Sequence, residues 1–229
     1  MAVAYDSSAS GAENSGSWSH TCSGSNRVLI VVLYIYGTGL TPAVTYGGVS
    51  MTLLQNGGST YHSFLVYILF NPPTGTNTVS FSVTSTHYRG VSASYKGVSA
   101  VNEPNYMGSS TFAGAAADTY MGFMSTFGDP YYTDSITIAM EATYCASNDG
   151  SIVTGINDDT AHTYVRQNAT FNTASQCLQI CDDAVYNGWM SPSNVRFRFN
   201  AVQLIESNHW GLTLYPAPIS KSNFFAFFN

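Results

Sequence analysis

The pattern of apolar and polar positions along this chain is typical of β-strands from one end to the other. Residues 27–37, RVLIVVLYIYG, and residues 61–75, YHSFLVYILFNPPTG, are continuous runs of β-branched and aromatic side chains that stop at glycine or proline. Such runs predict central, buried strands. Residues 77–86, NTVSFSVTST, alternate strictly, with Val79, Phe81 and Val83 on one face and hydroxyl side chains on the other. This alternation predicts a strand with one face in solvent.

Other segments share the strand pattern, and glycine, proline or asparagine turns separate them. No window of twelve residues carries an apolar stripe with the period of an amphipathic helix and caps at its ends. Many short strands divided by such turns indicate a β-sandwich or jelly roll. We therefore predict an all-β, single antiparallel β-sandwich domain over residues 1–205. The further strands are expected at residues 42–48, 49–58, 90–98, 135–145, 151–157, 162–171, 175–186 and 194–206.

The last residues, 206–229, predict an aromatic C-terminal arm beyond the domain. Pro216 and Pro218 cannot donate the hydrogen bonds of a sheet and keep the chain extended, so they act as a spacer. The apolar rings that follow point to more than one side, whereas a strand added to a sheet normally buries one face. We expect the arm to anchor the protein to a partner or to a neighbouring subunit; the alternative is that it covers the open end of its own sandwich. The expected partner-binding residues are Trp210, Tyr215, Phe224, Phe225, Phe227 and Phe228.

Charge is scarce, and this narrows the classes of function. Charged residues make up 9% of the chain, against roughly 25% in ordinary globular proteins. The net charge of −6 and the absence of a basic run argue against nucleic acid as a partner. The longest apolar stretch, which begins at Val28, is far shorter than the ~20 residues of a membrane-spanning helix. The first residues have neither a basic nor an apolar signal region, which predicts folding in a cytoplasm.

The residues that carry chemistry do not form a catalytic pattern. The four glutamates (Glu13, Glu103, Glu141 and Glu206) stand far apart, although glycosidases need two carboxyl groups close together. No Gly-x-Ser-x-Gly motif is present, and the histidines are scattered. We expect His20 to be structural, with a hydroxyl or a backbone carbonyl as its partner. The sequence therefore predicts no enzymatic activity and no cofactor.

Metal sites and disulfides are also not expected. The four cysteines, Cys22, Cys145, Cys177 and Cys181, lack a histidine at zinc-site spacing, and a cytoplasmic origin favours free, buried thiols. The acidic pairs at residues 158–159 and 182–183 offer oxygen ligands for Ca²⁺, but neither has the spacing of an EF-hand. Turn capping explains them better, because Asp and Asn stabilise β-turns locally.

The first hundred residues resemble a known module. The segments GSWSHTCSGSNRVLIVVLYIYG, AVTYGGVSMTLLQ and PPTGTNTVSFSVT look like a β-sandwich that recurs in phage structural proteins and some bacterial surface proteins. This resemblance implies a jelly-roll or concanavalin-like sandwich, often on the surface of a virion. It does not extend to the paired acids of concanavalin-like glycosidases.

These features together predict a non-enzymatic phage virion protein, most simply a capsid decoration or cement protein, assembled in the host cytoplasm. A neutral polar surface suits packed assemblies, since burying Ser, Asn or Tyr costs less than burying Lys or Glu. We therefore expect a capsid or other virion protein as partner and a homo-oligomer; the resemblance suggests a trimer. Two alternatives stay open: a receptor- or glycan-binding adhesin, and a polysaccharide-cleaving enzyme with an unrecognised site. The ligand-facing loop residues for a glycan would be Tyr131, Tyr132, Tyr186 and Trp189.

Overall fold

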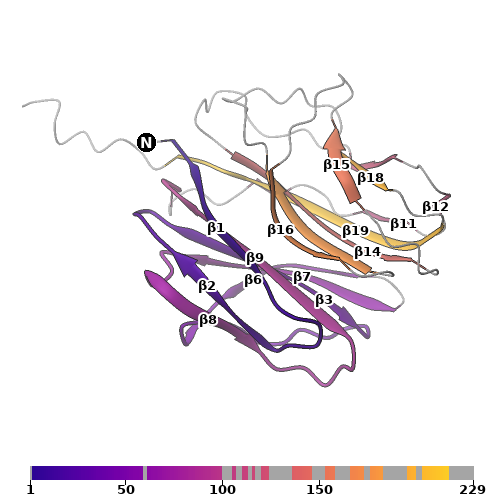
Figure 1. Ribbon diagram of the computed structural model, residues 1–229, viewed down its shortest axis with the longest axis horizontal. Helices are drawn as coiled ribbons and strands as arrows, with labels where there is room; N and C mark the ends of the chain where they lie inside the picture. Colours follow the sequence, from indigo (N-terminus) through magenta and orange to yellow (C-terminus); the bar gives the residue numbers. More distant parts are fainter. Residues whose placement is uncertain are drawn as a thin grey trace, which may run out of the picture.

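The computed structural model describes most of the first half of the chain and the strands of the second half (Figure 1). Every element within the described residues is a β-strand, and all strand pairs are antiparallel. The predicted antiparallel all-β fold is therefore confirmed. The described ranges are 2–58, 61–99, 105–106, 110–112, 115–116, 120–123, 136–145, 153–157, 166–172, 176–182, 195–199 and 203–216.

A five-stranded sheet, here called the central sheet, organises the molecule. Its strands lie in the order β1 (Ala4–Ser10), β9 (Tyr88–Lys96), β3 (Val28–Tyr36), β7 (His62–Phe70) and β6 (Thr52–Gly58). The two apolar runs of the sequence are β3 and β7, which pair along their whole length from Val28↔Phe70 to Tyr36↔His62. Both strands are buried on both faces, as the unbroken apolar pattern predicted.

One face of the central sheet packs against a four-stranded sheet and forms the sandwich. This second sheet has the order β2 (Ser17–Cys22), β8 (Gly75–Phe81), β4 (Val44–Tyr46) and β5 (Val49–Ser50). Odd-numbered residues of β3, such as Leu29, Leu33 and Ile35, meet Val79 and Tyr46 between the two sheets. Val79 and Phe81 are buried as the alternation of residues 77–86 predicted.

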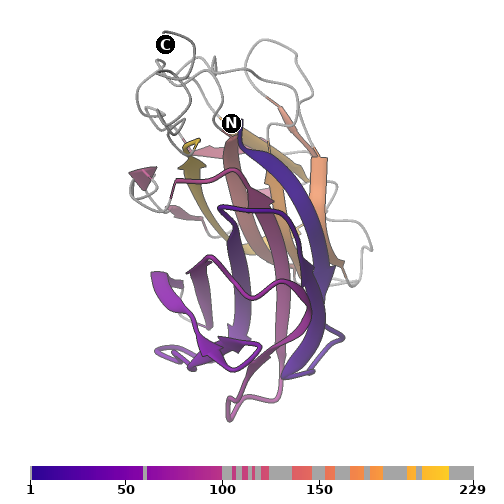
Figure 2. The ribbon, with the colours of Figure 1, turned by 90° about the vertical axis from the view of Figure 1, so that its left-hand side faces the viewer.

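The opposite face of the central sheet is covered by strands from the second half of the chain, which add a third layer (Figure 1). In Figure 2 these orange and yellow strands lie on one side of the indigo-to-magenta strands of the first half. The covering sheet contains β10 (Asn105–Tyr106), β19 (Gln203–Leu214), β14 (Ile136–Cys145), β17 (Gln176–Asp182) and β16 (Arg166–Asn172), with β11 (Ser110–Phe112) and β12 (Ala115–Ala116) also paired to β19. A three-stranded sheet contains β13 (Tyr120–Phe123), β18 (Val195–Phe199) and β15 (Val153–Asn157).

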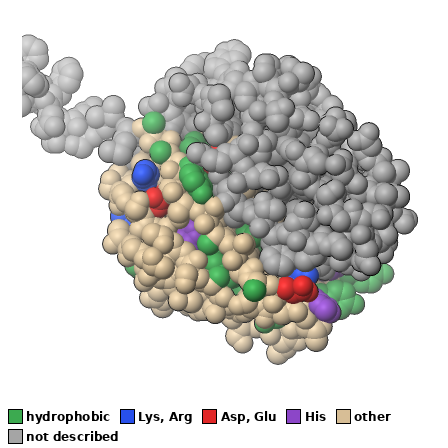
Figure 3. Space-filling model, viewed as in Figure 1, with side chains coloured by type: hydrophobic (Ala, Val, Ile, Leu, Met, Phe, Trp, Pro, Cys, Tyr) green, Lys and Arg blue, Asp and Glu red, His purple; other side chains and the backbone are tan. Residues whose placement is uncertain are grey.

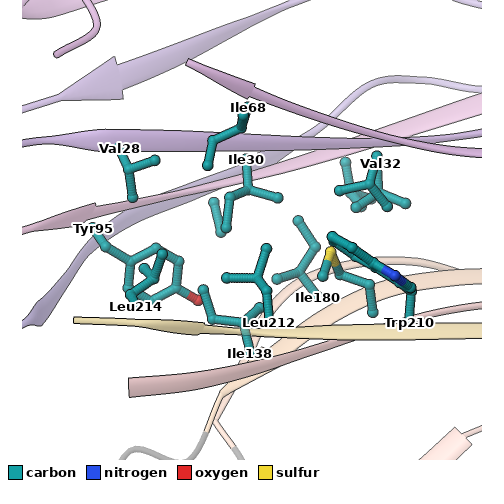
Figure 4. Close-up of a cluster of buried hydrophobic side chains, with 14 of the residues drawn as sticks. Val28, Ile30, Val32, Ile68, Tyr95, Ile138, Ile180, Trp210, Leu212 and Leu214 are labelled. Atoms are coloured by element: carbon teal, nitrogen blue, oxygen red, sulfur yellow. The ribbon is translucent and has the colours of Figure 1, made fainter. Parts of the chain in front are cut away.

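The core between the central sheet and the covering sheet is a large cluster of apolar side chains. Even-numbered residues of β3 project into it, opposite Ile138 of β14, Ile180 of β17 and Leu212 of β19 (Figure 4). Because β3 alternates between two cores, every one of its side chains except the terminal Tyr36 is buried. The sequence did not predict this third layer, since a run that is buried on both faces does not say what covers each face.

Two expectations for the end of the chain are wrong. The sequence predicts one strand over residues 194–206, but this segment contains parts of two strands. Strand β18 ends at Phe199 and pairs with β13 and β15. Strand β19 begins at Gln203 and pairs with β14. The domain also does not end at residue 205. Strand β19 continues to Leu214 and pairs with β14 along ten residues of that strand.

The first part of the predicted arm therefore belongs to the domain. The Trp210 and Tyr215 side chains are buried, and Trp210 packs in the core with Leu212. The Tyr215 carbonyl accepts a hydrogen bond from the Ser99 amide (2.8 Å), and Pro216 forms a bridge with Val98. These contacts correct the assignment of Trp210 and Tyr215 to a partner and of Pro216 to a free spacer. Residues 217–229, with all four phenylalanines of the arm, lie outside the described residues.

Candidate functional site: a buried histidine network, an exposed rim and a hydroxyl face

His20 lies in a buried polar network between the central sheet and the four-stranded sheet. Strand β2 alternates, so Trp18, His20 and Cys22 point inward toward β9 and β1. The His20 ring, only 2% exposed, lies with Nδ1 2.9 Å from Ser92 Oγ and Nε2 3.2 Å from Ser7 Oγ. The expectation that His20 has a hydroxyl partner is therefore confirmed.

A β-bulge brings an acidic side chain into the same network. Strand β1 carries one extra residue, Asp6, between Tyr5 and Ser7, which pair with consecutive residues of β9. Bulges re-aim side chains in this way. The Asp6 carboxylate accepts hydrogen bonds from the Ser94 hydroxyl (3.0 Å), from the Ser23 amide (2.7 Å) and from the Ser23 hydroxyl. The carboxylate is thus held by three donors within the fold.

The contacts of Ser7 favour one tautomer of His20. A carbonyl can only accept, so the contact of Ser7 with the Thr21 carbonyl uses the single hydroxyl proton of Ser7. Ser7 must then accept from His20, which places the imidazole proton on Nε2. In this tautomer the other ring nitrogen, Nδ1, accepts from the Ser92 hydroxyl at 2.9 Å, and the same hydroxyl lies 3.3 Å from the Ala9 carbonyl. Ser92 in turn accepts from the Trp18 indole N–H at 2.9 Å.

This network contains an acid, an imidazole and serines, as a catalytic site does, but these groups bind one another and hold the strands together. Burial lowers the pKa of His20 from 6.5 to about 4, although the negative charge of Asp6 acts in the opposite direction. His20 is therefore neutral at pH 7. The side chains of His20 and Ser92 are shielded from solvent, so a substrate cannot reach the imidazole or that hydroxyl. Trp18 closes the network from one side, with its ring directly over Gly90, where a Cβ would lie 2.3 Å from the indole.

A second cluster, here called the rim cluster, lies at the end of the central sheet where Tyr36 of β3 pairs with the buried His62 of β7. It consists of Tyr36, Tyr61, His62, His87 and Glu13. The Tyr36 ring is 50% exposed and makes edge contacts with the rings of His62 (centroids 5.4 Å apart) and His87 (6.3 Å). Its backbone is fixed too, because the Tyr36 amide donates to the His87 carbonyl (2.8 Å) and the Ser85 hydroxyl donates to the Tyr36 carbonyl (2.6 Å).

The other members of the rim cluster surround this ring. Tyr61 is 57% exposed, and its carbonyl accepts from the Gly37 amide at 2.7 Å. Glu13 Oε1 lies 2.7 Å from Nη2 of the buried Arg89 and 4.0 Å from Nδ1 of His87. Figure 3 shows acidic, histidine and apolar side chains side by side at one edge of the described part. The cluster presents rings and a carboxylate to solvent, and the fold holds their positions.

The outer face of the four-stranded sheet has a composition of its own and is here called the hydroxyl face. Its outward positions are all serine or threonine, and two cross-strand pairs, Thr21–Thr76 and Thr45–Ser80, have their side-chain oxygens 2.8 Å apart. No Asp, Glu, Lys or Arg occurs in β2 or between Arg27 and Arg89. The hydroxyl face is formed by Ser17, Ser19, Thr21, Thr45, Ser50, Thr76, Thr78 and Ser80.

The residues proposed from the sequence fall elsewhere. Trp210 and Tyr215 are in the core, whereas Tyr131, Tyr132, Tyr186, Trp189 and the four phenylalanines of the arm lie outside the described residues. Cys22 is a buried thiol, and its burial raises its pKa. The described residues contain no group of three or more potential metal-ligating side chains.

Sequence reasoning missed the rim cluster and the hydroxyl face. The signal for the hydroxyl face was present in the alternation of residues 77–86, but its neighbours across the sheet are far away in sequence.

Within the described part of the chain, no helix is long and apolar enough to span a membrane. Comparisons of this chain with protein-family models, curated proteins and solved structures found no match.

Proposed function

We propose that this protein is a non-enzymatic structural component of a phage particle, a decoration or cement protein that packs against the capsid. The observation that carries the proposal is the hydroxyl face: a whole sheet face, formed by strands without a charged residue, that presents only Ser and Thr. Burying such a surface against another protein removes no charge from water, and its hydroxyls can rotate to meet either donors or acceptors.

Two further features support this proposal. The acid, histidine and serines that come closest to a catalytic set are engaged in holding β1, β2 and β9 together. The segments of the first hundred residues that resemble the phage module include the strands that carry the hydroxyl face. The arm phenylalanines Phe224, Phe225, Phe227 and Phe228 remain predicted anchors, and a homo-oligomer, with a trimer favoured, remains the predicted assembly.

Co-sedimentation tests the proposal. Purified protein is mixed with capsids from the virus that carries its gene, and bound protein is measured in the pellet. We expect Thr78→Lys and Ser19→Lys, each of which puts a charge at the centre of the hydroxyl face, to lower binding while leaving the melting temperature nearly unchanged. The matched control is Ser25→Lys, at an exposed position near Arg27 and Lys96. Failure of the wild-type protein to sediment with capsids, or equal binding by all variants, contradicts the proposal.

A further inference from the structure

We propose that the rim cluster is a saccharide-binding site, with Tyr36 as the stacking platform and Glu13 as the acceptor for sugar hydroxyl groups. The site is independent of the proposed virion role, because it lies at the end of the central sheet and not on the hydroxyl face. The kind of ligand follows from three properties of the cluster: the rigidity of its ring, the orientation of its carboxylate and the absence of exposed aliphatic neighbours among the described residues.

The Tyr36 ring is pre-organised for stacking. Half of its surface is in solvent, yet the rings of His62 and His87 and two backbone hydrogen bonds hold the residue in place. His62 is itself fixed, since its ring stacks on Tyr34 with centroids 4.5 Å apart. A ligand that covers Tyr36 therefore does not have to immobilise a flexible side chain, which removes a cost of binding.

The Glu13 carboxylate is oriented by a buried cation. Oε1 faces the Arg89 guanidinium and the His87 imidazole, so one oxygen is committed to the protein. The second oxygen, Oε2, belongs to a side chain that is 44% exposed and lies beside the half-exposed His87. A carboxylate oxygen is a strong hydrogen-bond acceptor, and an imidazole supplies either a donor or an acceptor. These are the groups that recognise vicinal hydroxyls.

The surroundings favour a saccharide over an apolar protein segment. The exposed large apolar side chains of the described residues are Tyr36, Tyr61, Val49 and Leu53. Leu53 pairs with Tyr67, five residues along β7 from His62, and Val49 belongs to β5 in the other sheet. The rim therefore offers aromatic rings and polar groups without an aliphatic hydrophobic centre, whereas protein interfaces bury such a centre.

Saturation-transfer NMR with maltotriose, cellotriose and chitotriose at about 1 mM, the weak end of specific recognition, tests this site. We expect at least one of the three sugars to bind, Tyr36→Phe to retain binding, and Tyr36→Leu to weaken it by about tenfold, since only an aromatic ring stacks on a pyranose. Glu13→Ala should also weaken it. The control is Leu53→Ala, which truncates an exposed apolar residue outside the rim and should leave binding unchanged.

Three outcomes overturn the proposal. The first is the absence of binding by all three sugars. The second is binding that Tyr36→Leu leaves intact, which would show that the sugar does not stack on the Tyr36 ring. The third is binding that Leu53→Ala abolishes as fully as Tyr36→Leu does, which would place the ligand elsewhere. Melting temperatures of all variants separate loss of binding from loss of folding.

Discussion

The His20 network and the rim cluster contain the same kinds of side chain in opposite surroundings. Each has one carboxylate, at least one imidazole, aromatic rings and nearby hydroxyls. In the His20 network, both ring nitrogens of the imidazole bond to serine hydroxyls, and Ser7 also bonds to the Thr21 carbonyl, so these groups are engaged inside the protein. In the second, half of Tyr36 and nearly half of Glu13 face solvent. Residue types alone therefore do not identify a binding site.

The difference follows from where each cluster lies on the central sheet. His20 projects from β2, which lies over β9 and β1, so the four-stranded sheet covers the network. Tyr36 is the last residue of β3 and the only residue of that strand that is exposed. Strand ends present side chains to solvent, and strand centres in a layered fold bury them. The following predictions test whether this division into a structural and an available cluster holds.

The largest effect is expected for Trp18, whose indole seals the buried network. Trp18→Ala removes a large buried side chain above Gly90 and deprives Ser92 of its donor. We expect a loss of about 3–5 kcal/mol in the free energy of unfolding, measured by urea denaturation. A loss below about 1 kcal/mol would show that the network is not a structural unit.

The second prediction concerns pH. Above pH 6.5 His20 is neutral in both the folded and the unfolded chain, so it does not make stability depend on pH. Between pH 6.5 and about 4 the unfolded chain takes up a proton on His20 that the folded protein excludes. The free energy of unfolding therefore decreases as the pH is lowered through this range. The total change is about 3 kcal/mol. The contribution is lost in full only near pH 4, where the folded imidazole also titrates.

Urea denaturation at several pH values, compared between variants, isolates this contribution from that of the carboxylates. His20→Gln should be less stable at pH 7 but should lose stability less steeply below pH 6.5 than the wild type does. Thr45→Val, which removes no titratable group, should follow the wild-type pH dependence. The same steep decline in His20→Gln and in the wild type would contradict the assignment.

The sequence predicted the local features of both regions but not how they combine. Apolar runs and strict alternation identified β3, β7 and β8, since side-chain burial repeats with the period of the strand. The hydroxyl partner of His20 was expected because a buried imidazole needs one. The bulge at Asp6 and the pairing of Glu13 with Arg89 depend on contacts between residues 75 or more positions apart, and no local pattern encodes them.

The end of the chain shows the same limit in another way. Proline in the segment after Glu206 suggested an arm, but the twelve-residue strand β19 precedes Pro216, and ten of its residues pair with β14. Asn208, Trp210, Leu212 and Leu214, at every second position of β19, are all buried, and the nearby prolines and aromatic residues obscured this spacing in the sequence. Tertiary pairing decided the outcome, since β19 lies inside the covering sheet between β14 and the short strands β10, β11 and β12.

A smaller effect is expected at Ser92, the residue that links Trp18 to His20. Ser92→Ala leaves the indole N–H and the His20 Nδ1 atom buried without their partner. Orphaned buried polar groups cost about 1–3 kcal/mol, which urea denaturation can resolve. Thr45→Val is the matched control, since its hydroxyl pairs with Ser80 at the half-exposed hydroxyl face, where water can replace it. Equal costs for the two variants would remove the distinction between buried and exposed hydroxyl pairs.

The smallest effect on stability is expected at Tyr36, although its effect on binding should be large. The ring of Tyr36 touches His62 and His87 at the surface, and substitutions at such positions usually change the free energy of unfolding by no more than about 0.5 kcal/mol. Tyr36→Leu should therefore unfold at nearly the same urea concentration as the wild type while it loses saccharide binding. If Tyr36→Leu instead costs as much as Trp18→Ala, the rim ring is a structural element, and its exposure does not make it available to a ligand. A retained fold together with lost binding is the combination that only a surface platform produces.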